Sequence, residues 1–157
     1  MEKTNVMRIL DQKRIPYIPH CIGDNTTLSG ALVAKALGKP TDCVFKTLVT
    51  VAKSGEKYVF VIPIDRELDL KKAAKAVGEK SIDMLKQKEL LPLTGYIHGG
   101  CSPIGMKKFF KTTIDASAED KETICFSAGR VGYQVELSPN DIGKVIRFKY
   151  CSVVKDN

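Results

Sequence analysis

Apolar positions along the chain recur either at every second residue, as in strands, or at every third to fourth residue, as in helices. This pattern divides the chain into short strands and short helices. Residues 43–51 and 58–64 are rich in β-branched and aromatic side chains, as is typical of buried strands. Because turn-forming residues 53–56 separate them, the two runs predict a β-hairpin. Further strands are predicted over 110–115, 123–127 and 133–137, within 145–154, and as a proline-limited edge strand over 15–20.

Helices are predicted where apolar residues recur every three or four positions. Thr4 is a candidate N-cap for a short helix over 6–10. Asp69 is a candidate N-cap for a helix that Gly78 ends. Further helices are predicted over 28–37, over 82–91 with a stop at Pro92, and after Ser138-Pro139.

The order of these elements indicates the fold class. Strands outnumber those of a strict β-α-β alternation, and hairpins are mixed with helices. We therefore expect an α+β fold with a curled, barrel-like sheet, mixed or mostly antiparallel, flanked by helices. With 157 residues, of which 43% are hydrophobic and 27% charged, the chain is expected to form one domain over residues 1–157.

Composition narrows the classes of function. The net charge of +7 favours an anionic partner such as RNA or a phosphorylated ligand, but the chain has no RNP motif and no tryptophan. Its five cysteines form no C-x-x-C pair and its histidines number only two, so we expect reduced thiols, no metal and no cofactor. No apolar stretch approaches the ~18 residues of a membrane span, and no signal peptide is evident, so we expect a cytoplasmic protein without a membrane partner.

Lys46 lies in the middle of the apolar run 43–51. Since side chains alternate along a strand, Lys46 shares a face with Val44 and Leu48. A charge on an apolar face is costly unless it is paired or borders a polar cleft, so this lysine is a candidate functional residue. The alternative is an edge-strand lysine that reaches water and blocks aggregation.

The loop 94–105 contains four glycines and a proline. Gly99 and Gly100 allow backbone N–H groups to approach a ligand closely, and Pro103 fixes the exit of the turn. Successive N–H groups in such a turn can bind an anion or a carbonyl oxygen, although a tight structural loop has the same composition. The spacing differs from that of a phosphate-binding P-loop, which excludes nucleotide hydrolysis of that type.

The same loop carries His98 and Cys101, a pair that allows a thiol-nucleophile hypothesis. No third residue that would orient the pair is apparent in the sequence. Cys101 is therefore interpreted as a small loop residue in preference to a nucleophile.

A second polar cluster lies at 127–136. Ser127 precedes a glycine-containing bend, and Gln134 and Glu136 share one face of the outgoing strand, which by itself predicts a turn with a solvated face. Exposed lysines that could contact phosphates follow the glycine-rich loop at Lys107, Lys108 and Lys111.

Several segments, in the same order, resemble the YbaK family of freestanding aminoacyl-tRNA deacylases, relatives of the editing domain inserted in bacterial prolyl-tRNA synthetase. The matching segments are 44–48, 68–78, 95–105, 114–115 and 127–137. The resemblance implies a curled mixed-sheet domain that removes mischarged amino acids from tRNA. It implies tRNA(Pro) carrying cysteine as the typical substrate, tRNA(Cys) as a further one, and prolyl-tRNA synthetase as a candidate partner.

The resemblance also implies a site. Lys46 matches the family's strand lysine, and Gly99 through Pro103 match its G-x-x-x-P loop, so Lys46, Gly99 and Gly100 are the predicted catalytic residues. The predicted substrate-binding residues are Ile22, Ser29, Thr47, Cys101, Ser102, Pro103, Ser127 and Gln134. Relatives carry a tyrosine near Ile22, an aromatic residue near Ser29 and an aspartate at Gln134, so these positions are expected to tune amino-acid preference.

The implied chemistry needs no protein nucleophile, because an aminoacyl ester is already activated. In this family the substrate's own thiol attacks its carbonyl, and well-oriented intramolecular attack can reach effective molarities of ~10⁵ M. Lys46 would hold the ribose–phosphate end, and loop N–H groups would polarise the carbonyl. Two alternatives remain: a water-using deacylase of Ala-tRNA(Pro) or another small aminoacyl-tRNA, and a non-catalytic module that binds tRNA or a synthetase.

Overall fold

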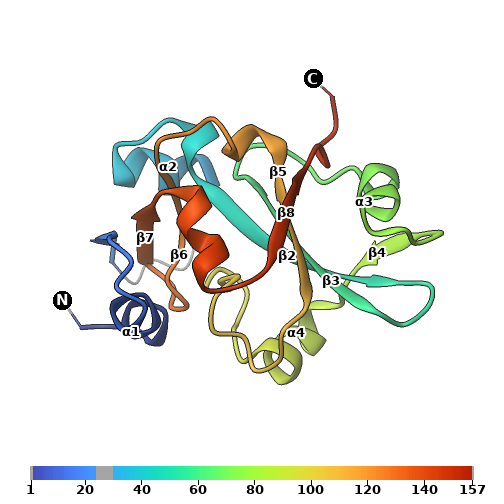
Figure 1. Ribbon diagram of the computed structural model, residues 1–157, viewed down its shortest axis with the longest axis horizontal. Helices are drawn as coiled ribbons and strands as arrows, with labels where there is room; N and C mark the ends of the chain where they lie inside the picture. The colour runs from blue at the N-terminus through green and yellow to red at the C-terminus, as the bar shows by residue number, and fades with distance from the viewer. Residues whose placement is uncertain (1, 24–29, 157) are drawn as a thin grey trace.

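The computed structural model describes residues 2–23 and 30–156, whose strands form two sheets (Figure 1). The smaller sheet is antiparallel, in the order β1 (Ile18–Cys21), β7 (Tyr133–Leu137), β6 (Ile124–Ser127). The larger sheet is mixed, in the order β4 (Ile82–Met84), β2 (Phe45–Ala52), β3 (Lys57–Pro63), β5 (Lys111–Asp115), β8 (Phe148–Cys151). These strands confirm the predicted hairpin, the predicted edge strand and the α+β class.

The two sheets meet at one point, an isolated parallel bridge between Val44 and Cys125. This bridge joins the residue before β2 to β6, so the start of β2 lies beside the smaller sheet. The sheet expected from the sequence is therefore divided in two at this seam, and it does not close into a barrel. β2 is paired by β3 along most of its length but by β4 only over Thr50–Ala52, so within the described residues Lys46 has a strand partner on one side only.

The described helices are short. The α-helices are α1 (Asn5–Gln12), α2 (Gly30–Leu37), α3 (Leu70–Val77) and α4 (Gln87–Thr94), and the 3₁₀ helices are η1 (Thr41–Cys43), η2 (Ala116–Ala118) and η3 (Pro139–Lys144). Thr4 caps α1 through Met7 N, and Asp69 accepts two backbone N–H groups at the start of α3, which confirms both predicted caps. None of these helices has the length and apolar character needed to cross a membrane.

The predicted helix over 82–91 is wrong at both ends. Ile82 to Met84 form β4 instead, because they pair with the far end of β2. The helix then continues through Pro92 to Gly95, whose left-handed backbone (φ 87°) ends it. The helix after Ser138 is a 3₁₀ helix, and the first part of the helix predicted over 28–37 lies outside the described residues.

The core has three parts. The largest cluster packs α1 and the smaller sheet against one face of the larger sheet, and the second packs α3 against its other face. A small third cluster lies at the seam, where Ala34 of α2 contacts Val44 and Cys125. Helix α2 therefore covers the junction of the two sheets.

Candidate functional site

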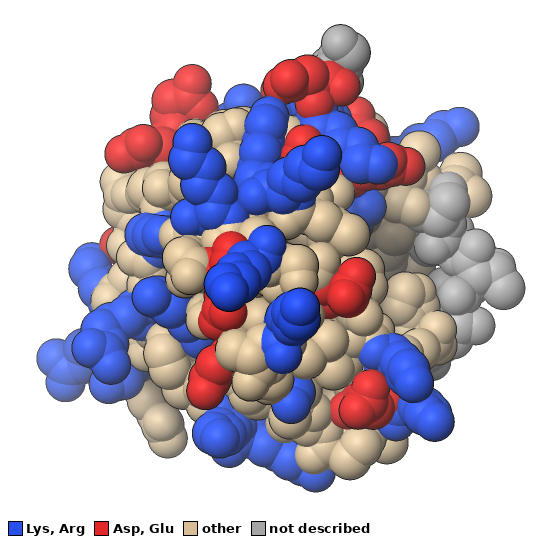
Figure 2. Space-filling model, turned by 90° about the vertical axis from the view of Figure 1, so that its right-hand side faces the viewer, with Lys and Arg blue, Asp and Glu red and all other residues tan. Residues whose placement is uncertain are grey.

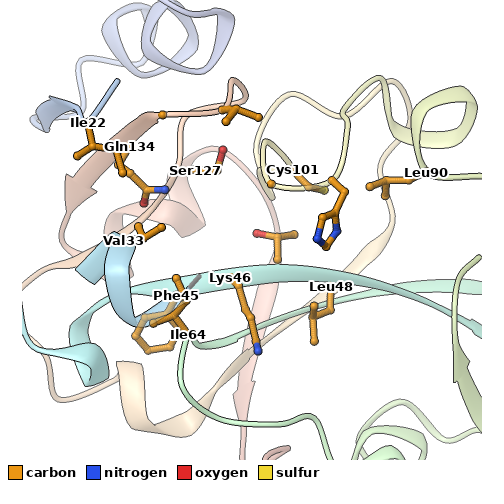
Figure 3. A pocket seen from close by; sticks show the side chains of 16 residues that line it. Ile22, Val33, Phe45, Lys46, Leu48, Ile64, Leu90, Cys101, Ser127 and Gln134 are labelled. Carbon is orange, nitrogen blue, oxygen red and sulfur yellow. The ribbon is translucent and has the colours of Figure 1, made fainter. Parts of the chain in front are cut away.

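A cavity of about 240 Å³ lies at this seam (Figure 3). Its walls are the start of β2, the glycine-rich loop, the β6–β7 turn, the segment after β1 and α2. The lining residues are Ile22, Gly30, Val33, Phe45, Lys46, Thr47, Leu48, Ile64, Leu90, His98, Gly99, Cys101, Ser127, Val131, Gly132 and Gln134. The volume is below the ~300–1,000 Å³ of pockets for drug-sized ligands, so it suits a small group.

Most of the predicted site residues come together here. Those that line the cavity are Ile22, Lys46, Thr47, Gly99, Cys101, Ser127 and Gln134. Three predicted residues, Gly100, Ser102 and Pro103, are not part of the lining. Ser102 is fully buried and accepts a hydrogen bond from the amide of Ile104 (3.3 Å), while Pro103 lines a separate, smaller hollow. Ser29 lies outside the described residues.

The sequence interpretation missed the apolar walls of the cavity. These are Val33, Phe45, Leu48, Ile64, Leu90 and Val131. In the sequence, such residues cannot be distinguished from ordinary core residues, because strand periodicity gives no information about an internal hollow. Gly30 was also missed, and a Cβ there would lie only 2.7 Å from Ile64 Cγ1, so only glycine lets α2 approach the end of β3.

Lys46 is one of the lining residues on β2, but its side chain leaves the strand on the side opposite to Ser127 and Gln134 (Figure 3). Its side chain is half-buried, and among the described residues it has no hydrogen-bond or ion-pair partner. Burial lowers the pKa of Lys46, and the carboxylates of Glu67 and Asp65 partly oppose that effect. In Figure 3 its nitrogen points away from Ser127 and Gln134. The ammonium group is thus suited to an anion at the edge of the cavity rather than to an atom in its interior.

Thr47 adds an unsatisfied polar atom. Its Oγ1 is buried and forms no hydrogen bond within the described structure. Because β4 pairs with β2 only at Thr50–Ala52, the edge of β2 at Thr47 has no β4 residue beside it. Buried hydroxyl groups normally have a partner, so this atom is a candidate ligand contact.

Ser127 and Gln134 face the cavity from the smaller sheet, where they are directly paired across β6 and β7. Both side chains are 8% exposed. Gln134 Oε1 is buried without a hydrogen-bond donor in the described structure. Ser127 Oγ accepts the amide N–H of Gly129 at 3.1 Å, so its own proton remains for an acceptor in the cavity. This pair therefore offers one acceptor and one donor.

The glycine-rich loop presents different backbone donors from those expected. The N–H of Gly100 donates to Ile97 O at 3.0 Å, and a Cβ at Gly100 would lie 3.2 Å from Val131 N. Gly100 therefore packs against the β6–β7 turn. In the part of the chain that the structure describes, the N–H groups of Gly99 and Cys101 have no acceptor, and both residues line the cavity. They are the loop's candidates for polarising a carbonyl.

Cys101 is poorly suited to act as a nucleophile. It is 8% exposed, and burial raises the pKa of its thiol to about 12. The thiolate is the nucleophilic form, so this thiol is nearly all protonated and unreactive near neutral pH. None of the described lining residues is a carboxylate that could act as a general base. The described part of the cavity wall thus provides hydrogen bonds and one cation, and its thiol is not an activated nucleophile.

Glu136 is not on a solvated face, as the sequence suggested, but 5% exposed. His20 Nε2 lies 2.9 Å from Oε1, while Lys39 Nζ and Thr123 Oγ1 donate to Oε2 at 3.0 and 2.7 Å. Although burial opposes ionisation, these hydrogen bonds lower the pKa of Glu136 to about 2. The side chains of His20, Cys125 and Glu136 each offer an atom that could bind a metal, and these atoms lie within 4.8 Å of one another. However, the ammonium group of Lys39 already forms an ion pair with the Glu136 carboxylate.

The fold and this cavity define a class: a small α+β domain with a small, partly polar cavity at the seam of its two sheets. The sequence matches the model of the aminoacyl-tRNA editing domain over residues 25–145. This match covers most of the chain, which therefore belongs to the aminoacyl-tRNA editing domain family.

Similar proteins agree with this assignment. The chain is 47% identical over 142 residues to EbsC of Enterococcus faecalis, described as a candidate Cys-tRNA(Pro)/Cys-tRNA(Cys) deacylase, covering 90% of this chain and 87% of that protein. It is 28% identical over 124 residues to the proline–tRNA ligase of Shouchella clausii, covering 78% of this chain but only 22% of the ligase.

Solved structures share the fold. A candidate trans-editing enzyme for prolyl-tRNA synthetase superposes with a TM-score of 0.82 at 19% identity, covering 99% of this chain and 100% of that one. The hypothetical protein APE2540 superposes with a TM-score of 0.86 at 21% identity, covering 97% and 100%. At these identities the likeness concerns the fold alone.

Proposed function

We propose that this protein is a trans-editing deacylase that removes cysteine from mischarged Cys-tRNA(Pro), with Cys-tRNA(Cys) as a second substrate. The observation that carries the proposal is the cavity itself. Thr47 and Gln134 line a volume that suits a small aminoacyl group, and within the described residues neither Thr47 Oγ1 nor Gln134 Oε1 has a hydrogen-bond partner, nor does the side chain of Lys46 beside them. Membership of the editing-domain family supports an aminoacyl ester as the substrate, and the name of the Enterococcus relative supports cysteine as the amino acid.

Each polar group then has a role toward the substrate. The α-ammonium of an aminoacyl ester carries N–H donors, which suit the acceptor oxygens of Gln134 and Thr47. The ester carbonyl would accept from the N–H groups of Gly99 and Cys101. Lys46, directed away from the interior, would bind a phosphate of the terminal nucleotides as a point charge. Partial burial disfavours the charged form of Lys46, and the negative charge of that phosphate would offset this cost.

The chemical step would use the substrate's sulfur. The thiolate attacks the ester carbonyl carbon, a C–S bond forms, and the C–O bond to the terminal ribose breaks. The ribose oxygen takes up a proton, so the products are tRNA and a cyclic thiolactone that water opens. A cysteine thiol with a pKa near 8.5 supplies a few per cent thiolate at neutral pH. The described cavity lining contains no carboxylate, and burial raises the pKa of its Cys101 thiol to about 12, which supports this route.

The experiment is a deacylation panel with purified protein. Cys-tRNA(Pro) should lose its ester rapidly, whereas Ser-tRNA(Pro), nearly isosteric but poorly nucleophilic, should survive. Pocket fit alone discriminates near-isosteres by only ~10²-fold, so a larger difference would indicate the thiol. Equal rates for the seryl, alanyl and cysteinyl esters would instead establish the water-using alternative. Binding without loss of any ester would indicate the non-catalytic module.

The partner and the location belong to the same proposal. A protein that clears mischarged tRNA(Pro) is expected to act in the cytoplasm alongside prolyl-tRNA synthetase. Adding that synthetase to the assay tests this: a faster rate at low tRNA concentration would support a joint complex, and an unchanged rate would indicate that the deacylase works alone.

A further inference from the structure

A second hollow, of about 410 Å³, lies where β5 and β8 begin at the end of the larger sheet. We call it the β5–β8 groove. It is lined by Phe109, Lys111, Thr112, Arg147, Phe148 and Lys149. Three of these residues are cations, two are phenyl rings and none is acidic. Phe109 is 51% exposed, so its ring is accessible to a ligand in the groove.

The cations of the groove differ in their availability. Lys149 Nζ donates to the carbonyl oxygen of Ala76 at the end of α3, so it already has an acceptor. Lys111 and Arg147 are exposed and have no partner within the described residues. The groove therefore presents two available positive charges and an exposed ring.

Basic charge alone does not distinguish this surface. Figure 2 shows lysine and arginine side chains across much of the face that carries α3 and the β2–β3 hairpin, with fewer acidic side chains among them. The distinguishing feature of the β5–β8 groove is the combination of aromatic rings with cations and the lack of any carboxylate in its lining. Proteins that bind unpaired nucleotides use this combination, because the cations neutralise phosphates while the rings stack on bases.

The groove is separate from the cavity but within reach of the same ligand. Lys46 pairs with Ile62, and Tyr58, four residues earlier on β3, pairs with Lys111. At ~3.3 Å per residue and ~4.8 Å per strand, the Lys46 and Lys111 backbones are about 16 Å apart. At ~3.4 Å per nucleotide of a stacked strand, that separation corresponds to about five nucleotides. The glycine-rich loop and Lys107-Lys108 connect the two places in sequence.

We propose that the β5–β8 groove is a second RNA-binding surface, which holds an unpaired stretch of the tRNA while its aminoacyl end occupies the cavity. This inference rests on the proposed function for the identity of the RNA. RNA binding by the groove can nevertheless be measured without any chemistry in the cavity, so the two proposals can fail separately.

The test is the affinity of fluorescently labelled, uncharged tRNA and of a short single-stranded RNA, measured at several salt concentrations. The double variant Lys111→Gln/Arg147→Gln should weaken binding about tenfold and reduce the slope of log K against log salt by about 1.5. Phe109→Ala should weaken binding about tenfold with the slope unchanged, because it removes stacking and not charge.

Matched controls are available elsewhere on the surface. Arg8→Gln/Lys13→Gln on α1 removes the same charge, and Met84→Ala removes an exposed apolar side chain (45% exposed) from β4, at the opposite edge of the sheet. Both controls should bind RNA within about twofold of wild type. Equal losses in the α1 and groove double variants would overturn the proposal in favour of net charge, and so would wild-type binding by Phe109→Ala. Melting temperatures establish that every variant is folded.

The same variants separate the groove from the cavity. All of them should cleave a small cysteine ester at the wild-type rate, while the groove variants raise KM for the aminoacyl-tRNA by about tenfold. If the protein proves not to be a deacylase, the binding results still decide the proposal. A groove variant that binds RNA normally but loses turnover of the small ester would contradict it.

Discussion

Thr47 and Gln134 line one cavity from two different sheets, and in the described structure neither Thr47 Oγ1 nor Gln134 Oε1 has a hydrogen-bond partner. Thr47 lies on β2 of the larger sheet and Gln134 on β7 of the smaller one. Each unsatisfied buried group lowers stability by about 1–3 kcal/mol. Their presence at the same cavity is explained if a polar ligand supplies a hydrogen-bond partner to each of the two oxygen atoms.

Replacing Thr47 by valine tests this explanation. The substitution keeps the shape and removes the unpaired oxygen, so we expect the free energy of unfolding to rise by about 1 kcal/mol while kcat/KM for Cys-tRNA(Pro) falls about tenfold. Thr50→Val on the same strand is the control, because Thr50 Oγ1 is buried but donates to Tyr58 O at 2.9 Å. That variant should lose stability and keep its activity per folded molecule. The reverse pattern would make Thr47 an ordinary core residue.

Lys46→Ala should leave the fold intact and lower kcat/KM at least about tenfold, or ~1.4 kcal/mol of transition-state stabilisation. Within the described residues the side chain has no hydrogen-bond or ion-pair partner to lose, and removing a half-buried charge should not reduce the melting temperature. Steady-state turnover at subsaturating tRNA measures the effect. Wild-type turnover by the alanine variant would show that the cavity is not the site of deacylation.

Gly100→Ala should reduce activity more than stability. The new Cβ would lie 3.2 Å from Val131 N, so the β6–β7 turn must move by a few tenths of an ångström, and Val131 and Gly132 line the cavity. The control is Gly143→Ala, whose Cβ would meet Phe148 Cε1 at an ordinary 3.6 Å. We expect a loss of about tenfold in kcat/KM only for Gly100→Ala. Equal behaviour of the two variants would assign Gly100 no role in shaping the cavity.

Cys101→Ser should keep most of the activity. Because burial raises the pKa of the Cys101 thiol to about 12, it contributes almost no thiolate over the pH range of the assay. Both wild type and variant should become faster as the pH rises toward ~8.5, where the substrate thiol ionises. A folded Cys101→Ser protein without activity would instead establish Cys101 as the nucleophile.

The lowered pKa of Glu136 predicts how the stability of the fold depends on pH. Its folded-state pKa, about 2, is below the ordinary value of 4.5, so its stabilising effect is present above pH 4.5 and is lost as the pH falls toward 2. The full effect is on the order of 3 kcal/mol. Urea unfolding of wild type and Glu136→Gln at several pH values measures it. The wild type should lose more stability than the variant on acidification, and parallel curves would contradict the prediction.

Local sequence determined much of the fold. The Lys53–Glu56 turn between two β-branched runs specifies the hairpin, and the side chains of Thr4 and Asp69 cap the helices that follow them. Alternation along 43–51 was enough to identify Lys46 as a charge on an apolar strand face. These features depend on residues within a few positions of one another, so a sequence pattern is sufficient to predict them.

Tertiary structure decided the rest, because those features depend on distant partners. Residues 82–84 are a strand only because β2 pairs with them. The burial of Glu136 depends on Lys39, 97 positions away, which donates to its carboxylate, and on His20, 116 positions away, which contacts it. The cavity likewise exists only where the two sheets meet. Its polar atoms come from residues that alternate normally along their own strands, and packing at the seam, not periodicity, left Thr47 Oγ1 and Gln134 Oε1 without a hydrogen-bond partner among the described residues.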